Sequence, residues 1–197
     1  MIDHARHVPL RPIPWSESDA TAAIEDIVAD GLEHFDAERF WPAHPLDEGI
    51  RDGHTSLYFG ATGVIWGIDY LGRVGATKAR FDFRPVLQRL LEASQAEFAK
   101  WKYAAHGAAG PLAKGSNLCH GTGGNGYALL KLYRRTNDLI WLEHARSFAM
   151  TAIAQYREAC DQLGRGRYSL WTGDIGLAVY LWDCLTAEPH FPTIDIF

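Results

Sequence analysis

The sequence has few cysteines, no long hydrophobic run and no excess of positive charge, and each absence excludes a class of protein. The three cysteines, Cys119, Cys160 and Cys184, are odd in number and widely separated, so we expect no disulfide framework and a reducing, cytoplasmic location. No apolar stretch is long enough to span a membrane, and the first residues lack the apolar core of a secretory signal. A formal net charge of −5 gives no reason to expect a nucleic-acid partner.

Hydrophobic residues are plentiful, at 47% of the chain, and they recur with helical spacing. The sequence shows no convincing alternation with a period of two, so we predict an all-α protein. Residues 1–16 are rich in proline and are predicted to be an irregular lead-in, and residues 17–197 to be a single helical domain. Three apolar stripes predict amphipathic helices. The first follows cap residues Ser18 and Asp19 and consists of Ile24, Ile27, Val28 and Leu32, and the second consists of Phe83, Val86, Leu87, Leu90, Leu91 and Phe98. The third lies between the cap at Asn137-Asp138 and the closing Gly164 and consists of Leu142, Ala145, Ala149, Ala152, Ile153 and Tyr156.

Three segments between these stripes resemble one another: SLYFGATGVIWGIDYL (56–71), NLCHGTGGNGYALLKL (117–132) and SLWTGDIGLAVYLWDC (169–184). Each has a small polar residue, leucine, two residues, glycine, two residues, a second glycine and then an apolar helix. Repeats of this kind are typical of stacked supersecondary units. We therefore expect three helical hairpins, each with an amphipathic outer helix and an apolar inner helix, and with the first glycines (Gly60, Gly121 and Gly173) at one end of the array.

The run from Gly121 to Gly126 also matches G-x-G-x-x-G, the fingerprint of dinucleotide-binding proteins. That fingerprint requires a preceding strand and a βαβ unit, which the chain does not show, and the repeat already accounts for Gly121 and Gly124. Cys119 and His120 stand just before Gly121, at the start of an inner helix. A helix N-terminus favours a thiolate, and thiolate and imidazole are good zinc ligands. The alternative is a buried cysteine beside a capping histidine.

The CHG-x-x-G-N motif, the SLYFG and SLWTG repeats and the closing FPTIDIF resemble the lanthionine synthetase C-like (LanC-like) family. The resemblance implies an α/α toroid of seven hairpins, here incomplete with about three. It implies that Cys119 and His120 are zinc ligands, and that the protein adds a thiol, from a peptide cysteine or from glutathione, to dehydroalanine or dehydrobutyrine. The stretch AAHGAAG (104–110) resembles a middle repeat of the family, which makes His106 a candidate acid/base, with a loop histidine as the alternative.

The resemblance also implies one more cysteine ligand, from the preceding repeat, and the sequence has none there. Tyr58 stands where that cysteine is expected, and Cys160, Cys184, His106 and His54 are the other candidates, although the acid/base role suits His106 better. We expect Cys160 to be a surface thiol, Cys184 to lie in the core and His54 to be a cap or turn residue.

The alternative function is therefore a non-catalytic remnant of the family that lacks a complete zinc site. A six-hairpin glycosidase-like toroid would need paired carboxylates facing one cleft, and the starts of the inner helices offer only Asp174. The Asp174 carboxylate could instead bind a cation, or simply interact favourably with the helix dipole. We expect Arg165 and Arg167 to be solvated loop charges. An open ring exposes apolar surface, so self-association is expected.

Overall fold

The computed structural model describes residues 11–47, 50–100, 115–119 and 121–195, and within these ranges it forms helices and no strand. The helices are α1 (Glu17–Glu33), α2 (Ala61–Arg73), the short 3-10 helix η2 (Arg84–Val86), α3 (Leu87–Lys100), α4 (Thr122–Thr136), α5 (Leu139–Leu163) and α6 (Asp174–Thr186). The predicted all-α fold class, with incomplete helical-hairpin repeats, is confirmed. No helix in the described part of the chain is both long and apolar enough to cross a membrane.

The ends of the outer helices follow local cap chemistry. Ser16 caps α1, its Oγ accepting a hydrogen bond from the Asp19 amide at 3.1 Å, so the helix begins slightly before the predicted cap at Ser18. Asp138 caps α5 in the same way, and Gly164 ends that helix with a left-handed φ of 69°. The three inner helices begin differently, because glycine is the N-cap of α2, α4 and α6 and provides no side-chain bond.

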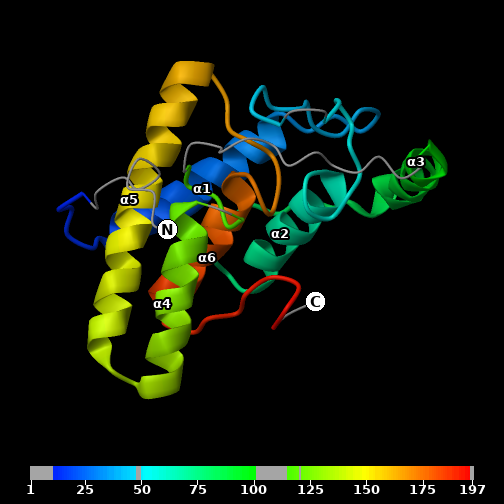
Figure 1. The fold of residues 1–197 in the computed structure, drawn as a ribbon. Coiled ribbons are helices and arrows are strands. Elements are labelled where there is room, and N and C mark those ends of the chain that lie inside the picture. The colour runs from blue at the N-terminus through cyan, green and yellow to red at the C-terminus, as the bar shows by residue number, and fades with distance from the viewer. Residues whose placement is uncertain (1–10, 48–49, 101–114, 120, 196–197) are drawn as a thin grey trace, which may run out of the picture.

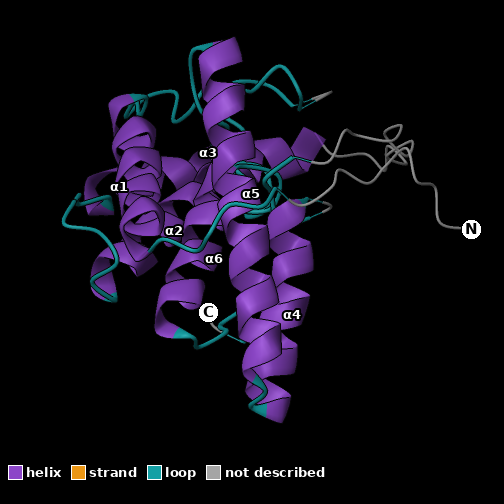
Figure 2. Ribbon diagram, turned by 90° about the vertical axis from the view of Figure 1, so that its left-hand side faces the viewer, coloured by secondary structure: helices purple, strands orange, loops and turns teal. Residues whose placement is uncertain are grey.

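Helix α6 lies at the centre of the molecule, and α1, α2, α4 and α5 all pack against it (Figure 1). Nearly every residue of α6 is buried, as expected for a helix that is apolar on all sides. The most extensive helix pair is the antiparallel hairpin of α4 and α5, which Figure 2 shows side by side. One pairing differs from the expected hairpins: α1 packs chiefly on α6 rather than on α2, because α6 offers the larger apolar surface.

Helix α3 lies to one side of the bundle (Figure 1). Phe83, Val86 and Leu90 of its predicted apolar stripe are buried, whereas Leu87 is 45% and Leu91 is 52% exposed. The side chain of Phe98 lies outside the described residues. The stripe is only half buried because α3 packs mainly on η2, and no long helix among the described residues packs extensively against it. Hydrogen bonds fix the C-terminal part of α3, where the Glu97 carboxylate accepts one from the Thr55 amide at 3.0 Å and one from the Thr55 hydroxyl at 2.6 Å.

Candidate functional site

The loops that lead into the three inner helices share one backbone geometry. In each, the first amide after the glycine donates to the carbonyl oxygen of the residue seven positions earlier: Ala61 to His54, Thr122 to Gly115 and Asp174 to Arg167, all at 2.8 Å. The glycine itself is required by this fold-back. A Cβ on Gly121 would lie 2.3 Å from the Gly115 oxygen, and a Cβ on Gly124 would lie 2.0 Å from the Leu118 oxygen. The repeated letters of the sequence therefore specify a repeated three-dimensional loop.

Residues at equivalent positions of these loops are joined to one another. Tyr58, Trp171 and Cys119 each stand two residues before the first glycine of a repeat. The Trp171 amide donates to the Tyr58 carbonyl oxygen at 3.1 Å, and the Cys119 amide donates to the Trp171 carbonyl oxygen at 2.9 Å. We call these three residues the motif row. The row brings the starts of α2, α6 and α4 together in that order, so the prediction that the three glycines lie at one end of the array is correct.

Cys119 is the member of the motif row that can act chemically. Its side chain is exposed, and it precedes the first residue of α4 by three positions. Partial burial raises the pKa of the Cys119 thiol, and the Arg167 guanidinium opposes that rise. The thiolate expected from the helix N-terminus is thus not favoured in the protein without metal. His120 and His106, the other two predicted site residues, lie outside the described residues, so their roles stay predictions.

The candidates for a further metal ligand do not join Cys119. Within the described ranges, no three His, Cys, Asp or Glu side chains form a group that could hold a metal ion. Cys184 is fully buried in the core, as predicted. Cys160 is half-buried on α5 rather than a plain surface thiol, and burial raises its pKa to about 11. His54 is a turn residue, as expected, and its Nδ1 contacts the Glu97 carboxylate.

Arg167 is not the solvated loop charge that the sequence suggested. Its side chain is 13% exposed, and its guanidinium pairs with Asp47, with Nε 3.0 Å from the carboxylate oxygen. Arg165 is also engaged, donating to the carbonyl oxygen of Ala43 at 2.9 Å. Both expectations were wrong because the loop at 43–47, which is remote in sequence, folds over these side chains. Nothing in the local sequence around Arg167 signals that partner.

Asp174, at the start of α6, is buried and supports the same loop. Its carboxylate accepts hydrogen bonds from the Arg167 amide at 2.6 Å and from the Ser116 hydroxyl at 3.4 Å. Burial raises the pKa of Asp174 to about 7, and nearby Asp30 adds to the rise. Asp30 accepts a hydrogen bond from the Gly166 amide at 3.0 Å. Asp174 therefore does more than meet the helix dipole, because it joins the loops before α4 and α6.

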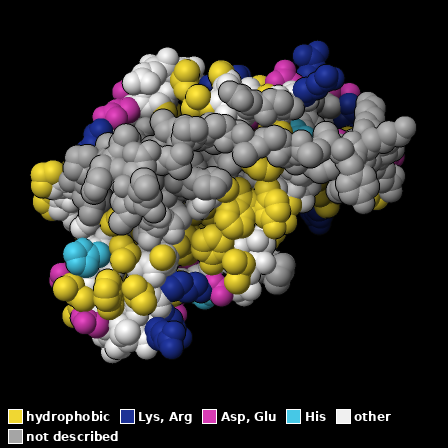
Figure 3. Space-filling view, in the orientation of Figure 1, with side chains coloured by type: hydrophobic (Ala, Val, Ile, Leu, Met, Phe, Trp, Pro, Cys, Tyr) yellow, Lys and Arg dark blue, Asp and Glu magenta, His cyan; other side chains and the backbone are white. Residues whose placement is uncertain are grey.

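A small cavity of about 70 Å³ opens between these loops and α5. The residues that line this cavity include Asn117, Gln155, Cys160, Arg167 and Asp174. On the other side of the site the surface is aromatic: the rings of Trp171 and Tyr58 meet edge to face at 5.2 Å, and Tyr58 is 46% exposed. Figure 3 shows apolar side chains gathered in the middle of this face of the molecule. The site thus has a small cavity with polar groups in its wall and an apolar shelf.

Comparison with known proteins gives a matching family and several similar proteins, two of which are described below. The sequence model of a family described as lanthionine synthetase C-like protein matches residues 89–196. A Danio rerio protein named glutathione S-transferase LANCL1 is 36% identical over 88 residues, which cover 44% of this chain and 22% of that protein. An Arabidopsis thaliana protein named LanC-like protein GCL1 is 30% identical over 191 residues, which cover 93% of this chain and 39% of that protein. The chain thus spans less than half the length of these curated relatives.

Proposed function

Because the chain belongs to the lanthionine synthetase C-like family, we propose that it takes part in zinc-dependent addition of a thiol to a dehydroalanine or dehydrobutyrine residue. The observation that carries the proposal is the place of Cys119: an exposed thiol in the motif row, where the starts of three inner helices meet. It also lies inside the matched range of the family. The substrates we propose are a dehydrated peptide and a thiol from a peptide cysteine or glutathione.

Cys119 and His120 are the residues that would hold the zinc ion. Cys119 fits this role because a soft sulfur ligand is exposed beside a helix N-terminus. The described residues do not complete the ligand set, so at least one more ligand has to come from outside them. When bound, zinc supplies a Lewis acid that lowers the pKa of a coordinated thiol. Because the pKa of Cys119 is raised in the free protein, binding of zinc has to release a proton there.

The chain's own residues then have three tasks. The cavity beside Asn117 and Arg167 receives part of the thiol substrate, and the Tyr58–Trp171 shelf receives apolar side chains of the peptide. The substrate thiol loses its proton, its sulfur forms a bond to the β-carbon as the carbon–carbon double bond of the dehydroamino acid becomes single, and the α-carbon gains a proton. We assign delivery of that proton to His106, in keeping with its position in the AAHGAAG motif.

Two observations support the choice of thiol and compartment. The name of the Danio rerio relative describes a glutathione transferase, which favours glutathione as one thiol donor here. Cys119, Cys160 and Cys184 form no disulfide bond with one another, which is typical of proteins in a reducing compartment, and we place the activity in the cytoplasm.

The test is adduct formation from glutathione and a dehydroalanine peptide, followed by mass spectrometry at neutral pH with zinc present. We expect a rate above the uncatalysed addition for the wild type and for Cys160→Ser. Cys119→Ser removes the candidate ligand and should bring the rate to the uncatalysed level, and His106→Gln should lower it at least ~10-fold. Equal rates for Cys119→Ser and Cys160→Ser would contradict the proposal.

A second candidate function is a helical scaffold of the same family that performs no chemistry. The observation that favours it is that no group of three metal-ligating side chains forms within the described ranges. In that case the wild type would give only the uncatalysed rate, whatever the zinc concentration, and the substitutions at Cys119 and His106 would change nothing. The same assay therefore separates the two candidates.

A further inference from the structure

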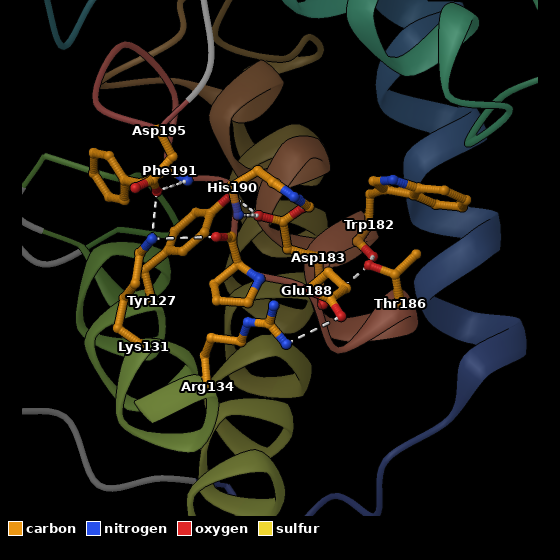
Figure 4. Close-up of polar contacts among 11 residues, drawn as sticks. Tyr127, Lys131, Arg134, Trp182, Asp183, Thr186, Glu188, His190, Phe191 and Asp195 are labelled. Carbon is orange, nitrogen blue, oxygen red and sulfur yellow. Dashed lines mark hydrogen bonds and ion pairs between the residues drawn. The ribbon is translucent and has the colours of Figure 1, made fainter. Parts of the chain in front are cut away.

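Asp183 is a fully buried carboxylate near the C-terminal end of α6. Its Oδ2 accepts two hydrogen bonds, from the Tyr127 hydroxyl at 2.8 Å and from the His190 backbone amide at 2.7 Å (Figure 4). Its Oδ1 has no hydrogen-bond partner among the described residues, and the Nδ1 of the His190 imidazole lies 3.8 Å from it. Burying a carboxylate with one oxygen unpaired costs free energy, which a leucine at this position would avoid. The carboxylate must therefore provide something that an apolar side chain cannot.

Asp183 provides an anchor for the segment after α6. We call residues 189–195 the strap. A second anchor comes from α4, where Lys131 donates to the Pro189 carbonyl oxygen at 3.1 Å and pairs with the Asp195 carboxylate. Asp195 in turn accepts a hydrogen bond from the Phe191 amide at 2.6 Å. The strap is thus fixed to two inner helices, on both sides of Phe191 (Figure 4).

The anchored strap holds Phe191 against the motif row. The Phe191 ring lies 4.9 Å from the Tyr127 ring and 5.3 Å from the Trp171 ring, between centroids. Trp171 accepts the hydrogen bond from the Cys119 amide through its own carbonyl oxygen, at 2.9 Å. A chain of contacts through the strap, Phe191 and Trp171 therefore joins the buried anchor at Asp183 to the candidate metal ligand.

We propose that Asp183 and Phe191 are positioning residues for Cys119, acting through the strap and Trp171. This inference rests on the proposed function only for the role of Cys119, since the contacts themselves involve no metal and no substrate. The physical reason is orientation. The Phe191 ring packs against the Trp171 ring and restricts its movement, and the Trp171 carbonyl oxygen accepts the hydrogen bond that holds the Cys119 backbone. Without Phe191 the Trp171 side chain gains room to move, and the Cys119 thiol becomes more accessible.

The experiment measures the rate at which iodoacetamide alkylates each cysteine of the full chain without metal, read on the separate peptides by mass spectrometry. We expect Phe191→Ala to raise the rate at Cys119 by ~3-fold or more, because a more accessible thiol reacts faster. Asp183→Leu should act in the same direction. Asp183→Asn keeps an oxygen acceptor for the strap and should restore the wild-type rate.

Two internal controls make the result decisive. Cys184 is fully buried, so its protection shows that the core is intact, and a variant that exposes Cys184 as much as Cys119 has simply unfolded. Arg134→Met removes an exposed ion pair to Glu188, beside the strap but outside the chain of contacts, and should leave Cys119 unchanged. The inference is overturned if Phe191→Ala leaves the Cys119 rate unchanged, or if the rates at Cys119 and Cys184 rise together. Because the assay needs neither zinc nor substrate, its failure is distinct from failure of the proposed activity.

Discussion

At the scale of single residues, one backbone position carries three different side chains. Tyr58, Trp171 and Cys119 occupy equivalent places in the motif row, and two of them are aromatic. The same position thus carries an aromatic side chain of the apolar shelf in two repeats, Tyr58 and Trp171, and a thiol, Cys119, in the third. The chemistry of the site therefore depends on which repeat carries the cysteine, while the backbone that holds it is common to all three.

Measuring zinc affinity tests directly whether Cys119 and His120 are metal ligands. Cys119→Ala and His120→Ala should each lower zinc affinity by ~10-fold or more, because a site with few ligands cannot lose another. Isothermal titration of the metal-free protein measures this. Cys160→Ser changes a thiol outside the motif and should bind zinc as the wild type does. Unchanged zinc affinity in the Cys119→Ala variant would refute the assignment.

The buried carboxylate of Asp174 predicts how stability depends on pH. Its pKa is raised to about 7 in the folded protein, above the usual value of an unfolded chain, so the folded state disfavours its ionisation. This penalty is absent below pH ~4 and grows as the pH rises to ~7. Asp174→Asn should therefore gain stability relative to the wild type between pH 5 and pH 8, by at most ~4 kcal/mol.

Urea denaturation at the two pH values measures the difference. Asp69→Asn is the matched control, because Asp69 is an exposed carboxylate paired with Arg73. It should show a small change that does not grow with pH. A gap between Asp174→Asn and the wild type that is the same at pH 5 and pH 8 would mean that Asp174 is not the group responsible.

At the scale of elements, close backbone contact decides how the inner helices begin. The second glycine of each repeat, Gly63, Gly124 or Gly176, lies over the carbonyl oxygen of the leucine six residues earlier, where a Cβ would approach to 2.0 Å or less. This contact folds the preceding loop back onto the first turn of the helix. The motif row depends on it, because the row consists of residues in those loops.

Gly124→Ala should therefore destabilise the protein by roughly 2–4 kcal/mol, since backbone atoms must move to admit the methyl group. Gly31→Ala is the matched control within a helix. A Cβ there would meet only Ile68 and Ile175 side chains at 3.6 and 3.7 Å, which is ordinary contact. Because alanine is the better helix former, this variant should be neutral or up to ~1 kcal/mol more stable. Thermal unfolding of both variants checks the prediction, which equal effects would contradict.

At the scale of the whole molecule, the inner helices form an arc. Helix α6 packs against both α2 and α4, so the first and last repeats of this chain meet directly, as they do in a closed ring. The outer flanks of the arc expose apolar side chains, among them Leu132 on α4 and Leu87 and Leu91 on α3. Such surface is uncommon on proteins that stay monomeric.

We therefore predict that the chain self-associates at tens of micromolar (roughly the range in which exposed apolar surface drives association), and that it binds a hydrophobic dye. Replacing Leu87 and Leu91 with lysine should shift light scattering toward the monomer. Lysines at Gln88 and Ala96 add the same charge to exposed positions of the same helix and should not. A wild-type protein that is monomeric at this concentration and binds no dye would show that the exposed apolar side chains do not drive self-association.

The sequence alone was sufficient for whatever depends on neighbouring residues. The caps at Asp138 and Gly164, the buried inner helix after Gly173 and the common end of the three glycine motifs all follow from spacing and local chemistry. The sequence also points to Cys119 as the reactive residue of the repeats, and that assignment stays a prediction. These features are local because a cap, a fold-back loop or an apolar stripe is complete within a few turns of chain.

Only the tertiary structure decided the contacts between distant segments. Arg167 and Asp47 are separated by 120 residues, and Tyr127 and Asp183 by 56, so no local pattern marks either pair. The same holds for Leu87 and Leu91, whose helical spacing is correct but whose burial depends on a helix packing against α3, which none of the described long helices does extensively. Periodicity tells which side chains would gain from burial. Whether they are buried, and whether a charge finds its partner, depends on which elements meet, and the free energy that decides this comes from the whole packed molecule.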